Sequence, residues 1–138
     1  MTLSRSVSLG TNGTSWQTIS ARDSKENFEP IDSEEVLKKL ANLSVTRWNY
    51  KAQDPSVKHI GPIAEDFHAA FGLNGTYNGT ISTQDFDGVA LAAIQGLNKK
   101  LERELADKQL EIDRLNEELR GYRSLVRRIE AIERAINN

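Results

Sequence analysis

The sequence has no cysteine, which excludes a disulfide framework and any metal site built on thiolate ligands. Histidine is almost as scarce: only His59 and His68 occur, so one chain cannot supply a site with three histidine ligands. No apolar run approaches the roughly 20 residues that a membrane-spanning helix needs. The first residues also lack the apolar centre of a signal peptide. We therefore expect no metal, no membrane partner and assembly inside a cell.

An excess of charge of one sign is also missing. The 138 residues include 18 Lys and Arg against 20 Asp and Glu, a net charge of −2. A chain this balanced has no bulk electrostatic attraction for nucleic acid or for an anionic membrane. It carries neither a phosphate-binding Gly-rich loop nor a Gly-x-Ser-x-Gly nucleophile elbow. The sequence therefore predicts no nucleic-acid partner and no cofactor.

The C-terminal part of the chain has the strongest pattern. Residues 89–138 contain no proline and only two glycines. This composition predicts one helix of about 48 residues, roughly 70 Å long at about 1.5 Å per residue. With Leu91 at position a of a heptad, seven of the nine a and d positions up to Leu119 are apolar. After a slip of three residues, a second heptad frame begins at Tyr122 and is apolar throughout.

These heptads predict a coiled coil whose seam includes Leu115, Leu119, Ile129 and Ile132. Residues 128–133 also follow the Arg-apolar-x-x-apolar-Glu pattern that is common in three-stranded coiled coils. At positions g and e, the arginine and glutamate of this pattern can pair between neighbouring chains, although a solvated charged surface has the same composition. We expect a parallel homotrimer. The alternative is a long helix that packs along its own globular domain, which a seam this narrow disfavours.

The first 88 residues predict a small mixed head of short strands and helices, so that the fold class is α+β. Asp32 and Glu35 have the capping-box spacing in front of an apolar helical face. Apolar residues spaced by four predict a second helix that starts near Ile63 and stops at Gly72. Short strands are predicted at residues 44–50, 59–62 and 81–83.

Three parts of different composition divide the chain. Residues 1–19 are rich in Gly, Ser, Thr and Asn, and we expect them to be the end of an upstream β-rich fibre segment with a linker. Residues 20–88 are the predicted head, and residues 89–138 are the predicted coiled-coil stalk. A head of about 70 residues without a disulfide or a metal has a marginal core and usually needs oligomerisation, which the stalk would supply.

Four ordered blocks of the chain resemble one known family. They are Ser20–Phe28, Trp48–Lys51, His59–Phe67 and Asp87–Gln95. Together they resemble the C-terminal intramolecular chaperone domain of endosialidase tailspikes, L-shaped tail fibres and neck appendages, which bacterial proteins also carry. The resemblance runs from about Ser20 to about Leu101, whereas the coiled coil beyond it is compatible but generic.

The resemblance implies a domain that trimerises, helps a β-rich fibre to fold, and then cuts itself off on the N-terminal side of a serine. That serine and a lysine five residues later form the dyad; they correspond here to Ser20 and Lys25, so the cleaved bond is Ile19–Ser20. Such a protein is a single-turnover, self-cleaving serine endopeptidase. A lysine can serve as the base when burial or nearby cations lower its pKa. The family's usual aspartate after the serine is Ala21 here, which removes an orienting carboxylate and leaves the cleavage rate open.

His59, Gly61 and Asn27 are candidate supporting residues for this chemistry. His59 and Gly61 match the family's His-Ile-Gly block, where the glycine is expected to permit a close backbone approach. The histidine donates either to the oxyanion or cleavage loop, or within a structural hydrogen bond. Glu65 and His68 have the helical spacing of a metal-binding pair, but no third ligand accompanies them.

Two other functions fit the same sequence. The chain can be a structural trimerisation cap that has lost cleavage, or, less well, a coiled-coil adaptor that binds a partner through its head. In the chaperone interpretation, its partners are two further copies and the upstream fibre domain of the same chain. Assembly is then expected in the cytoplasm of a phage host or a bacterium, with a virion tail fibre or a cell-surface protein as the parent.

Overall fold

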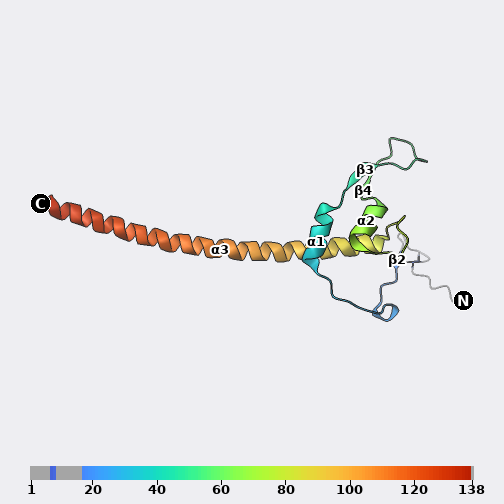
Figure 1. Cartoon of the computed structure of the whole chain (residues 1–138), viewed down its shortest axis with the longest axis horizontal. Helices are drawn as coiled ribbons and strands as arrows, with labels where there is room; N and C mark the ends of the chain where they lie inside the picture. Colours follow the sequence, from blue (N-terminus) through green and yellow to red (C-terminus); the bar gives the residue numbers. More distant parts are fainter. Residues whose placement is uncertain (1–6, 9–16, 138) are drawn as a thin grey trace. The chain divides into compact units, whose positions relative to one another are not determined.

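The fold is α+β and ends in a long helix, as the sequence predicts. The computed structural model describes residues 7–8 and 17–137, and these form three α-helices, one 3₁₀ turn and two small antiparallel sheets (Figure 1). The chain divides into two compact units, which we call the first unit (residues 1–96) and the second unit (residues 97–138). The association into a trimer stays a prediction.

The elements follow one another in a simple order. They are β1 (Val7–Ser8), β2 (Gln17–Thr18), the 3₁₀ turn η1 (Arg22–Ser24), α1 (Ser33–Asn42), β3 (Thr46–Trp48), β4 (His59–Gly61), α2 (Ala64–Phe71) and α3 (Thr83–Ile136). β1 pairs with β2, and β3 pairs with β4, with Trp48 directly opposite His59. The turn expected between the first two strands lies mostly at residues 9–16, outside the described residues.

The strand predicted at residues 81–83 is wrong. Thr83 is the first residue of α3, and the Phe86 amide donates to the Ser82 carbonyl at 3.0 Å, so the helix begins earlier than its composition indicated. Two other boundaries agree with the prediction. Oδ1 of Asp32 accepts from the Glu34 and Glu35 amides at 3.0 and 3.3 Å and caps α1. α2 ends at Gly72, whose φ of 65° is the left-handed conformation that glycine adopts without strain.

The core of the first unit is thin. Among the described residues, its buried apolar side chains are Phe67, Val89, Ala92 and Ala93, from α2 and the start of α3. The Phe67 ring lies 4.9 Å from that of Phe71 and 6.0 Å from that of Phe86 between centroids. So few buried side chains give little hydrophobic stabilisation, which agrees with a core that needs further partners.

α1 meets α3 at a point where only a glycine fits. Ser33, the first residue of α1, is 2% exposed and lies against Gly96 of α3. A Cβ built on Gly96 would be 2.1 Å from the Ser33 carbonyl oxygen and 2.7 Å from its carbonyl carbon. Because both contacts are with backbone, no side-chain rotation could relieve them. The glycine inside this helix is therefore a packing requirement.

The start of α3 uses one face for its own unit and leaves another open. The buried positions Val89, Ala92, Ala93 and Gly96 are f, b, c and f of the heptad frame, the outward positions of a coiled coil. The seam positions Leu91 and Ile94 are 64% and 63% exposed. The alternative predicted from the sequence was a long helix packed along its own globular domain. The buried positions show such packing only at the start of α3, and there only on its outward face.

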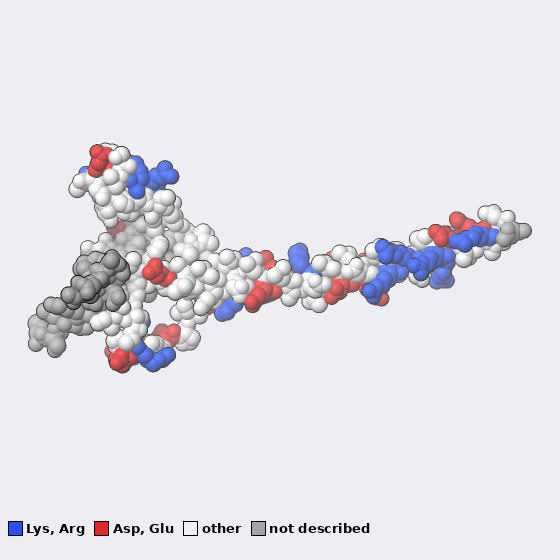
Figure 2. Space-filling view, turned by 180° about the vertical axis from the view of Figure 1, so that it is seen from behind, with Lys and Arg blue, Asp and Glu red and all other residues white. Residues whose placement is uncertain are grey.

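The second unit is helical from Leu97 to Ile136, and its described side chains are exposed. Acidic and basic residues are distributed along its surface (Figure 2). Arg114 bridges Glu111 and Glu118, one turn away on either side, and its hydrogen bond lowers the pKa of Glu111. Pairs at this spacing stabilise a helix locally, so the charged faces support the helix while the seam stays apolar.

Candidate functional site

The 3₁₀ turn η1 shapes the segment that contains Ser20 and Lys25. The Ala21 carbonyl accepts from the Ser24 amide at 3.2 Å and from the Ser24 hydroxyl at 2.7 Å. The Lys25 amide then donates to the Arg22 carbonyl at 3.2 Å. These bonds fold the chain back on itself, which lets two side chains five positions apart meet.

Ser20 and Lys25 are in direct contact. Nζ of Lys25 donates to Oγ of Ser20 at 2.6 Å, and both side chains are exposed. This separation is within the range over which a base can take a hydroxyl proton. The peptide bond before Ser20 belongs to Ile19, which is 51% exposed. A hydroxyl group, an amine and the peptide bond before Ser20 therefore lie within one turn of chain.

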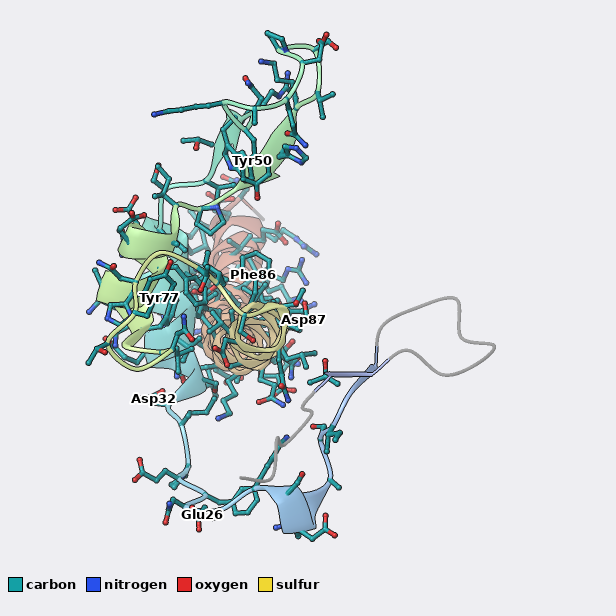
Figure 3. All side chains as sticks on the ribbon, turned by 90° about the vertical axis from the view of Figure 1, so that its right-hand side faces the viewer. Glu26, Asp32, Tyr50, Tyr77, Phe86 and Asp87 are labelled. Carbon is teal, nitrogen blue, oxygen red and sulfur yellow. The ribbon has the colours of Figure 1, made fainter. Side chains whose placement is uncertain are left out.

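The pair lines a hollow of about 890 Å³. Thr18, Ser20 and Lys25 line one side, and the start of α3 lines the other through Thr83, Gln84, Asp87, Gly88 and Leu91. Figure 3, which looks along α3, shows Phe86 on the side of α2 and Asp87 on the side that faces the N-terminal segment. The sequence analysis missed this second wall.

A signal for that wall was present in the heptad frame. Extending the frame one heptad before Leu91 makes Gln84 an a residue and Asp87 a d residue. Asp87 is also the one carboxylate among the described residues that line the hollow, whereas Ala21 supplies none and Asp23 is not part of the lining.

His59 lies in an aromatic cluster of the β3–β4 hairpin. Its ring is 4.9 Å from that of Trp48 and 5.4 Å from that of Tyr50, and its Nε2 lies 2.9 Å from Oε1 of Gln53. Figure 3 places Tyr50 at one end of the first unit and Glu26, next to Lys25, at the other. Within one chain, His59 thus makes the structural contacts that the sequence left as an alternative.

Neither Gly61 nor Asn27 is among the described residues that line the hollow beside Ser20 and Lys25. A Cβ on Gly61 would meet Nε1 of Trp48 at 3.8 Å, an ordinary van der Waals distance, so the close approach expected there is wrong. Asn27 has a positive φ of 55°, a conformation that asparagine tolerates better than most residues. Its position indicates a turn after Lys25.

The described residues offer no metal centre. No group of three or more His, Asp or Glu side chains comes together in residues 7–8 and 17–137. His68, half of the Glu65–His68 pair, has its Nδ1 2.7 Å from the Leu73 carbonyl and so helps to close the end of α2. In the same part of the chain, no helix has both the length and the apolar content to cross a membrane.

Comparison with known families gives a match that begins at Ser20. Residues 20–76 match the model of a peptidase family described as chaperone of endosialidase. This segment belongs to the chaperone of endosialidase family. The match includes the first three of the four blocks, and the fourth block, at the start of α3, lies beyond it. No curated protein matches the chain. The chaperone segment thus comprises η1, α1, the β3–β4 hairpin and α2.

Proposed function

We propose that the chain is a C-terminal intramolecular chaperone that trimerises through α3, assists the folding of a β-rich fibre segment before it, and then releases itself at the Ile19–Ser20 bond. The observation that carries this proposal is the 2.6 Å contact between Lys25 Nζ and Ser20 Oγ at the first residue of the family match. The peptidase classification of the family is consistent with a cleaving domain.

The first half of the reaction moves the acyl group from nitrogen to oxygen. Oγ of Ser20 attacks the carbonyl carbon of Ile19 while neutral Lys25 accepts the hydroxyl proton. The C–N bond of the Ile19–Ser20 peptide then breaks, and Lys25 returns the proton to the departing Ser20 nitrogen. The product is an ester between the Ile19 acyl group and the Ser20 hydroxyl oxygen, with a free amine on Ser20.

The second half hydrolyses this ester. Lys25 takes a proton from a water molecule, whose oxygen attacks the ester carbonyl carbon. The C–O bond to Ser20 breaks, the Ser20 oxygen regains a proton from Lys25, and Ile19 leaves as a carboxylic acid. The lysine ends unchanged, so each chain cuts once and needs no external reagent except water.

Association of copies is the step that we expect to start cleavage. An ordinary lysine, with a pKa of about 10.4, is less than about 1% neutral at pH 7. Removing water from around an amine favours its neutral form. Since both side chains of the dyad are exposed in a single chain, partner copies have to exclude the water. This dependence makes cleavage a report on correct assembly.

α3 supplies the surface for association. Its seam residues Leu115, Leu119, Ile129 and Ile132 are each about half exposed, with no cover from the described part of their own chain. Full burial of such side chains stabilises by roughly 1.5–3 kcal/mol each. We propose a parallel homotrimer that assembles in the cytoplasm of a phage host or bacterium, as part of a tail fibre or cell-surface protein.

The test is intact mass spectrometry of the purified protein and of two substitutions. The parent should lose residues 1–19, whereas Ser20→Ala and Lys25→Ala should each stay intact and still sediment as trimers. Ser44→Ala and Lys99→Ala, which change an exposed serine and lysine away from the hollow and outside the four blocks, are the matched controls and should cut like the parent.

Two outcomes would decide against the proposal. If Lys25→Ala cuts at the parental rate, Lys25 is not the base and the proposed dyad is wrong. A parent that stays intact as a trimer would instead support the non-cleaving structural cap, for which the loss of the family's aspartate at Ala21 is the favouring observation. In that case Ala21→Asp is the variant to examine, since it restores the carboxylate.

A further inference from the structure

The loop between α2 and α3 contains the tripeptide Asn-Gly-Thr twice, at residues 74–76 and 78–80. In an Asn-Gly pair, the backbone nitrogen of the glycine can attack Cγ of the asparagine, because the glycine has no Cβ to obstruct the approach. Local sequence therefore makes both asparagines chemically labile. With two copies in one loop, the effect of the structure on this reaction can be separated from the effect of the sequence.

The side chain of Asn74 is held in place. Its Nδ2 donates to the Tyr77 carbonyl at 3.1 Å, to the Thr80 carbonyl at 3.3 Å and to Oγ1 of Thr80 at 3.2 Å. Such bonds from asparagine to nearby backbone stabilise a turn. Nδ2 is the atom that has to leave when the glycine nitrogen attacks, so these bonds must break before Asn74 can react. The first copy is therefore protected.

The side chain of Asn78 has no such restraint. Asn74 and Asn78 are both exposed, so water reaches the two alike. Within residues 7–8 and 17–137, the Asn78 side chain makes no hydrogen bond, and the amide of Gly79 donates none. Both the carbon that is attacked and the nitrogen that attacks are available. The two asparagines thus differ in hydrogen bonding and not in exposure.

We propose that Asn78 is a site of spontaneous modification, at which the side-chain amide becomes a carboxylate through a cyclic imide, while Asn74 resists the same reaction. The Gly79 nitrogen bonds to Cγ of Asn78, the bond from Cγ to Nδ2 breaks, and ammonia leaves with the proton of the Gly79 nitrogen. Water then opens the imide. Opening at Cγ gives aspartate, and opening at the main-chain carbonyl carbon gives isoaspartate, whose backbone runs through the side chain.

The labile pair lies between the two carbonyls that Asn74 binds. Tyr77 precedes the Asn78–Gly79 pair and Thr80 follows it. Both products carry a new negative charge, and isoaspartate also inserts a CH₂ group into the backbone between these two acceptors. Asn74 can then no longer bind both carbonyls in the same geometry. Since Gly79 and Thr80 also line a hollow of about 510 Å³ next to the β3–β4 hairpin, the modification loosens the loop and changes this surface.

Peptide mapping of the aged protein tests the proposal. The purified protein is incubated in mildly alkaline buffer, which favours attack by the glycine nitrogen, and fragment ions assign the products to residue 74 or 78. Asn78 should react at least about tenfold faster than Asn74, because three hydrogen bonds hold Asn74. In denaturant, where these bonds are absent, the two should react at similar rates. Neither measurement depends on whether the chain cleaves itself.

Two threonine variants test whether the hydrogen bonds cause the difference. Thr80→Val removes the hydroxyl that accepts from Asn74 and should accelerate the reaction of Asn74 by about two- to tenfold, the effect of one hydrogen bond. Thr76→Val is the matched control, because the Thr76 hydroxyl makes no hydrogen bond among the described residues. It should leave the rate at Asn74 unchanged.

Three outcomes would count against the proposal. Conversion of Asn74 at the rate of Asn78 or faster in the folded protein would overturn it. An Asn78 that reacts in denaturant but not in the folded protein would also overturn it, since the loop would then protect both copies. Equal rates at Asn74 in Thr80→Val and Thr76→Val would show that the observed hydrogen bonds do not protect this residue.

Discussion

Gly96 shows how one missing side chain decides the packing of the first unit. A glycine in the interior of a helix costs about 1 kcal/mol relative to alanine, so its presence needs a compensating contact. The compensation is the backbone of Ser33, which occupies the space that a Cβ would need. The residue that local propensity disfavours is the one that lets α1 reach α3.

We predict that Gly96→Ala destabilises the first unit in spite of the better helix propensity of alanine. Overpacking against rigid backbone costs roughly 1–3 kcal/mol, which exceeds the gain in propensity. Gly121→Ala is the matched control, because nothing lies within 4 Å of a Cβ there, and it should stabilise the helix. Thermal unfolding followed by circular dichroism measures both variants. A Gly96→Ala protein that melts at or above the parental temperature would contradict the contact.

The dyad illustrates a different lesson at the same scale. Two residues with unremarkable surroundings, both exposed, come into contact because the turn between them is closed by Ser24. The contact between Ser20 and Lys25 does not exclude water, because both side chains are exposed. Reactivity in the proposed mechanism therefore depends on what covers Ser20 and Lys25 after association, and not on their contact alone.

At the scale of the element, α3 combines two surfaces on one helix. In its first turns the outward positions Val89, Ala92, Ala93 and Gly96 are buried, with Gly96 against Ser33 of α1, and the seam positions Leu91 and Ile94 are exposed. Further along, the described side chains are exposed on every face, and ion pairs such as Arg114 with Glu111 stabilise the charged faces. An exposed apolar stripe along a helix of 54 residues favours association with the same stripe of further copies, as in the proposed trimer.

The seam of the second heptad frame gives a direct prediction. Ile129→Asp combined with Ile132→Asp should dissociate the trimer, because loss of a buried isoleucine costs roughly 2–5 kcal/mol and every substitution acts three times. Ser124→Asp combined with Ala131→Asp adds the same charge at two outward c positions and should leave the trimer intact. Sedimentation velocity distinguishes the two. An unchanged trimer in the isoleucine pair would refute the assigned seam.

At the scale of the whole molecule, the predicted assembly couples two units of unequal kind. The first unit contains Ser20 and Lys25, but few apolar side chains of its described residues are buried. The second unit contains most of the seam but no part of the hollow. In the proposed function neither unit is sufficient, since one carries the chemistry and the other holds the copies together.

Truncation after Lys100 tests this division. The remaining seam has only Leu91 and Ile94 as apolar layers, so we expect both trimer content and cleavage to fall sharply. Light scattering after size exclusion, together with intact mass, measures the two effects on one sample. Replacing residues 101–138 by an unrelated trimeric coiled coil in the same heptad register should restore both. Full cleavage by a truncated chain that is demonstrably monomeric would contradict the coupling.

Sequence reasoning succeeded where a feature depends on neighbours along the chain. Capping by Asp32, the end of α2 at Gly72 and the long C-terminal helix follow from hydrogen bonds and periodicity within a few residues. The proximity of Ser20 and Lys25 was expected from the family resemblance, and the contact is closed by a local turn. These interactions join residues only a few positions apart, so the local sequence is sufficient to predict them.

Sequence reasoning failed where a feature depends on the steric fit between segments that are distant in the chain. The strand predicted at 81–83 rested on β-branched residues, a preference weak enough for the start of α3 to override it. The close backbone approach was expected at Gly61 but lies at Gly96, because its cause is Ser33, sixty-three positions earlier in the chain. The α3 wall of the hollow, with Asp87 facing the N-terminal segment, likewise joins residues that no local pattern connects. The sequence alone determined most of the helices and their ends and the heptad spacing that predicts a seam, since each is a periodic or local property. Only the tertiary structure decided which face of α3 is used within the chain and that the dyad lies beside the face left open, because steric fit between remote segments is not encoded in any short stretch.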